Sequence, residues 1–193
     1  MGVSYLFFYM ISGKLLACLL FTTLHCFVYG LLVKKYDDQC SEALLEENVD
    51  KKEVKKKYKH KKKVALVISI FIQVGLLFVY KYMPFFLGNV NTIAKWVGLD
   101  VELKIHKLIA PIGLSFYTLE ALAYMVDVYQ GKIEGEKKIH KLALFLAFFP
   151  QIMEGPIDRY DGESALFQGN PITYEGLCYG CQRILYGLLK KIV

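Results

Sequence analysis

Residues 108–159 read LIAPIGLSFYTLEALAYMVDVYQGKIEGEKKIHKLALFLAFFPQIMEGPIDR, and they place polar and ionisable side chains inside runs that are otherwise apolar enough for lipid. A carboxylate near the centre of a bilayer costs roughly 2.5 to 3.5 kcal/mol on insertion scales. Such groups therefore face the interior of a helical bundle, a water-filled cavity or a substrate path. Glu120 is the first side chain in the stretch that needs such surroundings.

The composition of the whole chain agrees with a membrane environment. Of 193 residues, 55% are hydrophobic and 15% aromatic, and the mean hydropathy is +0.34. These values exceed those of an ordinary soluble domain. The five cysteines are an odd number and lie mostly in apolar runs, which favours packing over disulfides. We therefore expect an all-α polytopic membrane protein, with residues 1–193 forming a single incomplete membrane domain.

Hydrophobic runs and charged loops predict how the chain crosses the bilayer. About 20 apolar residues are needed to cross ~30 Å of hydrocarbon, which predicts spans at about 15–33, 64–87 and 108–129. Residues 34–63 carry eleven Lys against seven Asp or Glu and are expected to form a basic cytoplasmic loop that touches anionic lipid, not nucleic acid. A re-entrant or short membrane segment at 141–157 and a membrane-associated helix at 176–193 complete the expected topology.

Four side chains form a polar stripe along the third predicted span. Tyr117, Glu120, Tyr124 and Asp127 follow one another at i, i+3, i+7 and i+10, so one face of a helix carries them all. This face should point to protein or water, where it would line a binding path. The alternative is that the two carboxylates pair with a basic group on a neighbouring helix and only hold the bundle together.

Prolines interrupt the next apolar run. Leu142 to Phe149 are eight residues that rise only ~12 Å as a helix, well short of the hydrocarbon thickness. Pro150 and Pro156 remove two backbone donors, which predicts a re-entrant turn that faces a site. A plain loop at the membrane surface is the alternative. The polar lining of the turn would be Gln151, Glu154, Asp158 and Arg159.

Several kinds of chemistry have no motif in the sequence. We find no phosphate-binding glycine loop, no GxSxG, no HExxH and no paired metal-ligand motif. The CxxC at residues 178–181 has no second cysteine pair and no nearby histidine, so a zinc or redox role is not expected. The sequence therefore indicates a polar wall inside a membrane bundle, without an assigned catalytic residue, metal or bound cofactor.

Three stretches resemble a known family. PIGLSFYTLEALAYMVDVYQGK (111–132), FFPQIMEGPIDRY (148–160) and YGCQRILYGLLKKIV (179–193) are similar to the membrane-bound O-acyltransferase family, in the bacterial branch with alginate O-acetylation and teichoic-acid D-alanyl transfer proteins. Pro150, Gly155, Pro156 and Arg159 match the motif of the family, and Asp158 also matches the D-alanyl transfer group. The chain looks like an incomplete N-terminal part, with a partial bundle of the family type.

The resemblance implies a function as well as a fold. It implies a multi-helix bundle around a tunnel in a bacterial plasma membrane, where an acyl group passes from a cytosolic donor to a hydroxyl of an envelope glycan. The donor, acetyl-CoA or an acyl carrier protein, would be a substrate, and an envelope-side acyltransferase would be a further partner. The histidine base of the family is expected beyond Val193, so this chain alone is expected to be inactive.

The sequence leaves other functions open. Acetyl transfer to a surface polysaccharide is favoured over D-alanyl transfer to teichoic acid, because residues 116–129 are closer to the alginate-type group. Broken helices at membrane depth also occur in transporters, so a transport or scaffold subunit without acyl transfer is an alternative. An inactive gene fragment is the third.

Overall fold

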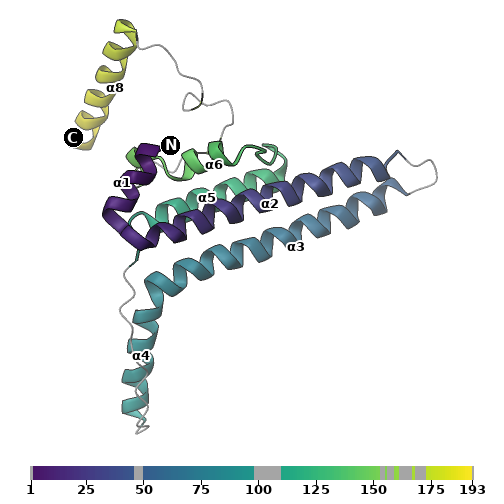
Figure 1. The fold of residues 1–193 in the computed structure, drawn as a ribbon, viewed down its shortest axis with the longest axis horizontal. Coiled ribbons are helices and arrows are strands. Elements are labelled where there is room, and N and C mark those ends of the chain that lie inside the picture. The colour runs from purple at the N-terminus through teal and green to yellow at the C-terminus, as the bar shows by residue number, and fades with distance from the viewer. Residues whose placement is uncertain are drawn as a thin grey trace. The chain divides into compact units, whose positions relative to one another are not determined.

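The computed structural model of the chain describes residues 2–45, 50–97, 110–152, 155, 159–160, 167 and 173–192. The chain divides into two compact units, Met1–Gly162 and Glu163–Val193. Within the described ranges every regular element is a helix, which confirms the all-α class (Figure 1). The elements of the first unit are α1 (Gly2–Ser12), the 3-10 turn η1 (Gly13–Leu15), α2 (Leu16–Ala43), α3 (Lys51–Leu77), the π-helical η2 (Phe78–Tyr82), α4 (Met83–Trp96), α5 (Leu114–Gln130), α6 (Ile139–Leu146) and α7 (Phe149–Ile152); α8 (Tyr174–Ile192) belongs to the second.

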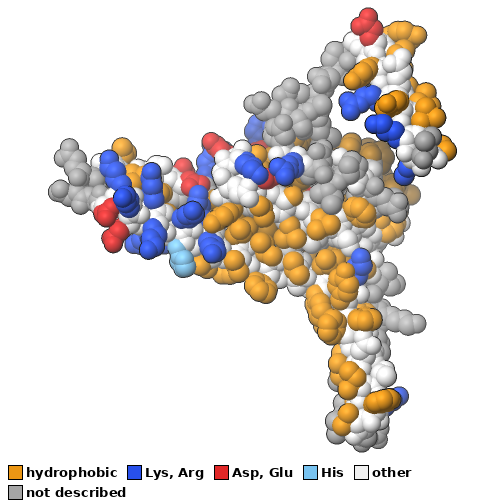
Figure 2. Space-filling model, turned by 180° about the vertical axis from the view of Figure 1, so that it is seen from behind, with side chains coloured by type: hydrophobic (Ala, Val, Ile, Leu, Met, Phe, Trp, Pro, Cys, Tyr) orange, Lys and Arg blue, Asp and Glu red, His pale blue; other side chains and the backbone are white. Residues whose placement is uncertain are grey.

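Among the described residues, two continuous helical stretches are long and apolar enough to cross a membrane. They are Gly2–Ala43 and Lys51–Trp96, and they contain the predicted spans 15–33 and 64–87. Figure 2 shows apolar side chains covering a broad part of the surface beside a region crowded with lysines. Such a surface is suited to lipid contact, and the sharp change from apolar to basic side chains is typical of the edge of a bilayer.

The third predicted span begins later than expected. The helix α5 starts at Leu114, after Pro111 and after Gly113, whose φ of 71° lies in the left-handed region. Residues 108–109 lie outside the described residues. With 17 residues α5 is about 26 Å long, slightly less than the ~30 Å core of a bilayer.

The segment predicted as a basic loop, residues 34–63, is helical over most of its length. Helix α2 continues to Ala43 and α3 begins at Lys51, where the Asp50 side chain accepts a hydrogen bond from the Lys52 N–H at 2.9 Å. The excess of lysine indicates where the chain leaves the lipid. Lys and Glu also have high helix propensity, so α2 and α3 both extend beyond their apolar residues.

Three helices form the centre of the first unit. Helix α2 packs against α3 and α5, and α3 packs against α5. Figure 1 shows α2 and α3 running side by side. A core cluster joins α1, α2, α5 and the α6–α7 region through Phe8, Leu19, Leu114, Tyr117, Ala147 and Ile152. Between lipid-embedded helices the driving force is close packing and hydrogen bonding, since lipid tails are as apolar as the core.

Two close backbone approaches fix this packing. A Cβ atom on Gly135 would fall within 3 Å of the carbonyl group of Gly30, in the middle of α2. A Cβ atom on Gly113 would likewise overlap the carbonyl of Ile152. Glycine is therefore needed where the connection after α5 crosses α2 and where α7 meets the start of α5.

The helix that begins at Lys51 bends at η2, and the axis of α4 departs from that of α3 (Figure 1). The Met83 N–H donates to the carbonyl of Phe78, five residues back. Pro84 follows, and its ring would clash with the carbonyl of Tyr80 in a regular α-helix. The wider π turn accommodates this proline, which explains a bend without a break.

Pro150 also determines where α6 ends. In a continuous helix its ring would clash with the carbonyl of Leu146, and α6 ends at that residue. The short helix predicted at Leu142 to Phe149 is found three residues earlier, because α6 spans Ile139–Leu146 and Phe149 belongs to α7. Pro150 lies in the first turn of α7, where a missing N–H costs nothing. The re-entrant geometry stays a prediction, since residues 153–154 and 156–158 lie outside the described residues.

The second unit contains α8, which overlaps the helix predicted at 176–193. None of its described residues is buried within the structure. Its large apolar side chains are exposed, among them Leu177, Ile184 and Leu188. The membrane association of α8 stays a prediction.

Candidate functional site

The polar stripe on α5 faces the protein interior. Tyr117 and Tyr124 are 0% exposed, Glu120 is 3% exposed and Asp127 is 6% exposed. The predicted orientation of this face, away from lipid, is therefore confirmed. Because α5 packs against both α2 and α3, the stripe lies within a three-helix interior and not at an open surface.

The first part of the stripe leaves polar atoms without partners. The Tyr117 ring packs edge-to-face against Phe8, with 6.5 Å between the ring centroids. Its hydroxyl is buried and, among the described residues, has no hydrogen-bond partner. The same holds for the hydroxyl of Thr118. A buried polar group without a partner is costly at membrane depth, so these two hydroxyls need an explanation that packing alone does not give.

Helices α2 and α3 contribute further polar groups to this interior. Gln73 of α3 is fully buried and donates from Nε2 to Oγ1 of Thr22 on α2 at 3.0 Å. The Gln73 amide also interacts with the imidazole of His25 on α2. Gln73 was not among the predicted site residues, although an amide in the middle of the 64–87 span was a usable signal.

The second part of the stripe has a structural role. The Tyr124 hydroxyl accepts a hydrogen bond from the Glu136 N–H at 3.0 Å. The Tyr160 hydroxyl donates to the Glu136 carboxylate at 2.5 Å, and the rings of Tyr160 and Tyr124 meet edge-to-face at 5.3 Å. Neither Glu136 nor Tyr160 was expected as a partner, since one lies in a basic loop and the other follows the proline motif.

The environment of Glu136 changes its protonation. Partial burial acts to raise the pKa of this carboxyl. The hydrogen bonds from Tyr160 and the Lys138 N–H, together with the nearby charge of Lys141, outweigh the burial and leave the pKa below its usual value. The carboxylate is thus held ionised as an acceptor that clamps residue 160 to the loop after α5.

Asp127 pairs locally. Its carboxylate lies 3.4 Å from Nζ of Lys132, and the Lys132 N–H donates to the Asp127 carbonyl at 3.0 Å. The turn depends on Gly131, whose φ of 71° ends α5. The basic partner is therefore in the turn that follows the same helix, and not on a neighbouring helix as the structural alternative proposed.

The structure describes two of the four residues expected in the proline-broken lining. Gln151 is half-buried on α7, and α7 reaches the start of the stripe because Ile152 belongs to the same core cluster as Tyr117. Arg159 is exposed. Glu154 and Asp158 lie outside the described residues. The tunnel-lining role of all eight predicted residues stays a prediction.

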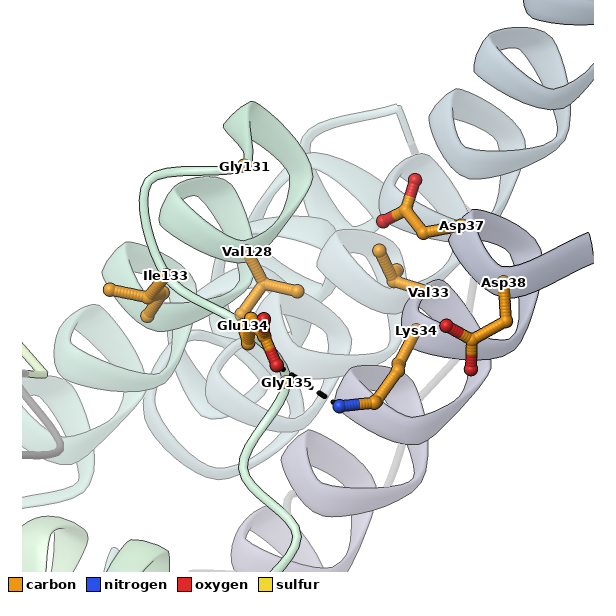
Figure 3. A pocket seen from close by; sticks show the side chains of 9 residues that line it. All are labelled: Val33, Lys34, Asp37, Asp38, Val128, Gly131, Ile133, Glu134 and Gly135. Carbon is orange, nitrogen blue, oxygen red and sulfur yellow. Dashed lines mark hydrogen bonds and ion pairs between the residues drawn. The ribbon is translucent and has the colours of Figure 1, made fainter. Parts of the chain in front are cut away.

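A separate hollow of about 230 Å³ lies between the end of α2 and the connection after α5 (Figure 3). Figure 3 shows Lys34 reaching across it to Glu134, at 3.0 Å, with Asp37 and Asp38 on the α2 side. The hydrogen bond from Lys34 lowers the pKa of Glu134. Of the six predicted site residues that the structure describes, none lines this hollow. In the same described part of the chain, no three His, Cys, Asp or Glu side chains gather as metal ligands.

Comparison with known proteins identifies relatives with named activities. No family model and no solved structure matches the chain. It is 31% identical over 127 residues to a probable alginate O-acetylase of Pseudomonas putida, which is 66% of this chain and 26% of that protein. A peptidoglycan O-acetyltransferase of Helicobacter pylori is 29% identical over 159 residues, covering 68% of this chain and 29% of the relative.

A third relative extends the range of named substrates. A teichoic acid D-alanyltransferase of Bacillus subtilis is 32% identical over 94 residues, which is 46% of this chain and 23% of the relative. The chain spans about a quarter of the length of the curated relatives it matches. By name, these relatives transfer acetyl or D-alanyl groups. The chain belongs to the membrane-bound O-acyltransferase family, in the bacterial branch that includes the alginate O-acetylases.

Proposed function

We propose that this chain contributes the first helices of a membrane O-acyltransferase that transfers an acetyl group from a cytosolic donor to hydroxyls of a cell-surface polysaccharide. The observation that carries the proposal is the similarity to O-acetylases over two thirds of the chain. The donor would be acetyl-CoA or an acyl carrier protein, and the protein would act in a bacterial plasma membrane beside an envelope-side acyltransferase.

The interior of the three-helix unit supports this role without supplying the chemistry. Among the described residues, the hydroxyls of Tyr117 and Thr118 have no hydrogen-bond partner, and each can bond to a polar molecule. Acyl transfer to a sugar hydroxyl needs such groups to orient the acyl carbonyl and the acceptor. It also needs a general base, which we expect to be a histidine outside this chain.

A chimera tests the proposal. In the alginate O-acetylase of Pseudomonas putida the matching segment is replaced by this chain, and acetate released by mild alkali from the secreted alginate is measured. We expect acetylation well above that of cells without an acetylase. A chimera that accumulates in membranes at the level of the parent enzyme, folded by protease protection, yet transfers no acetyl group would refute the proposal.

Two variants of the chimera separate a binding wall from a passive scaffold. Tyr117→Phe removes a buried hydroxyl with little change in shape, and we expect about a tenfold loss of activity, the factor for one lost hydrogen bond of about 1.4 kcal/mol. Tyr9→Phe is the matched control, because Tyr9 is 57% exposed. Equal activity of both variants would favour a scaffold or transport role for this unit.

Transfer of D-alanine is the second candidate, and the relative from Bacillus subtilis favours it. The two reactions differ in the acyl group that mild alkali releases from the polymer. Release of D-alanine and no acetate, from cells that carry the corresponding chimera with the teichoic acid enzyme, would assign the chain to this second reaction.

A further inference from the structure

A groove lies between α2 and α3 where the lysine-rich part of α3 gives way to its apolar part. Its volume is about 330 Å³. One end is polar, with Tyr36, His60 and Lys61, and the other is apolar, with Leu32, Val64 and Ile68. The groove therefore has a polar lining at one end and an apolar lining at the other.

The polar end presents a cation. The Lys61 ammonium lies over two aromatic rings, 5.0 Å from the centroid of Tyr58 and 5.9 Å from that of Tyr36. Within the described ranges Lys61 forms no ion pair, whereas the next residue, Lys62, pairs with Asp37 at 2.6 Å. The aromatic rings hold the Lys61 side chain in place without neutralising it, so its charge is available to an anion.

The apolar end is open to the surroundings of the helices. Leu32 is 37% exposed, Val64 43% and Ile68 55%. Lys61, Val64 and Ile68 are spaced by three and four residues and share one face of α3, over a rise of about 10 Å. An amphiphile lying along this face would meet a cation first and hydrocarbon next.

The position of the groove along the chain suits the edge of a bilayer. Figure 2 shows lysine side chains crowded together at one end of the helical surface and apolar side chains covering the adjoining part. Lysines just outside an apolar span attract the anionic lipids of the cytoplasmic leaflet, and a lysine in direct contact with the headgroup contributes about a fivefold increase in affinity. The excess of lysine in residues 34–63 favours a lipid with net negative charge over a zwitterionic one.

We propose that this groove is a binding site for one anionic phospholipid of the cytoplasmic leaflet. The phosphate contacts Lys61 and His60, and the upper part of an acyl chain lies along Val64 and Ile68. The site does not depend on the proposed acyl transfer, because none of its residues belongs to the polar interior around α5.

Native mass spectrometry of the full chain, released from detergent, tests the site. The chain is titrated with phosphatidylglycerol and with phosphatidylcholine of identical acyl chains, and the bound lipid is counted. We expect one phosphatidylglycerol to bind at least fivefold more tightly than phosphatidylcholine. Lys61→Gln should lower this affinity about fivefold, whereas Lys61→Arg should retain it.

Two further variants distinguish binding of the lipid in the groove from a general attraction of anionic lipid to the basic surface. Lys63→Gln removes the same charge two residues away from an exposed position outside the groove, and it should change the affinity less than twofold. Ala65→Trp keeps every charge but fills the groove, and it should abolish tight binding. Helix content by circular dichroism confirms that each variant is folded.

The contrary results are equally distinct. If Lys63→Gln weakened binding as much as Lys61→Gln, the lysines would act only as a diffuse basic surface. If Ala65→Trp bound normally, or if soluble glycerol phosphate competed as well as the lipid, the apolar end would have no part in binding. Each of these outcomes would overturn the proposed site.

Discussion

Replacing Gly135 by alanine tests how the loop after α5 is held against α2. A methyl group at this position would fall within 3 Å of the carbonyl group of Gly30, and both contacts are to backbone that cannot rotate away. The loop or the helix would have to move by about 1 Å. Overpacking of this kind costs about 1 to 3 kcal/mol, and we expect the upper half of the range because no side chain can yield.

The shift should also weaken the neighbouring hydrogen bond from the Glu136 N–H to the Tyr124 hydroxyl. For a chain of 193 residues, a loss of about 2 to 3 kcal/mol corresponds to a midpoint of thermal unfolding about 5 to 10 °C lower. The assay is thermal unfolding in detergent, followed by circular dichroism.

Two glycine variants serve as controls. Gly75→Ala, inside α3, meets no atom within 4 Å and should be neutral or stabilise the helix by up to about 1 kcal/mol. Gly30→Ala would place its methyl 2.6 Å from the Tyr124 hydroxyl, which can move, so the expected loss is smaller than that of Gly135→Ala. If Gly135→Ala unfolded at the same temperature as Gly75→Ala, the close approach of loop and helix would be refuted.

Three further perturbations probe other contacts of the first unit. Tyr160→Phe should lower the free energy of unfolding by about 1 to 2 kcal/mol at pH 7, since it removes the hydrogen bond to Glu136. Because the folded-state pKa of Glu136 is depressed, this contribution is present above the usual pKa of 4.5 and should vanish as the pH falls through the lower folded-state pKa. Unfolding of both proteins at pH 7 and in acid measures the difference. A double-mutant cycle with Thr22→Val and Gln73→Leu should give a coupling energy of about 0.6 kcal/mol, and a coupling of zero would argue against their hydrogen bond. Lys62→Gln should cost less than about 1 kcal/mol, with an effect that fades at high salt, since its ion pair lies at the surface.

Much of the fold follows from local patterns. Apolar runs located the two long spans, and the spacing of Tyr117, Glu120, Tyr124 and Asp127 placed these side chains on a buried face. Pro150 predicted a helix too short to cross the bilayer, although α6 ends at Leu146, three residues before the predicted end at Phe149. Such features depend on neighbours along the chain, so the sequence alone determines them.

Most contacts within the site join residues far apart in sequence. The pairing of Asp127 with Lys132 is local, and it could have been expected from the glycine turn. The approach of Gly135 to Gly30 and the bond between Gln73 and Thr22 require the crossing of helices, which no local pattern specifies. The sequence also did not predict that α2 and α3 extend into residues 34–63, because a high density of charged residues indicates where lipid ends and not where a helix ends.

The π turn at residues 78–82 sets the rotation of everything that follows it on the same helix. One extra residue in a turn rotates later side chains by about 100° relative to an uninterrupted α-helix. Periodic patterns counted from α3 into α4 therefore join residues that do not share a face. Deleting one residue within 78–82, together with replacing Pro84, would turn the apolar face of α4 in a new direction while leaving the packing of α3 on α2 intact.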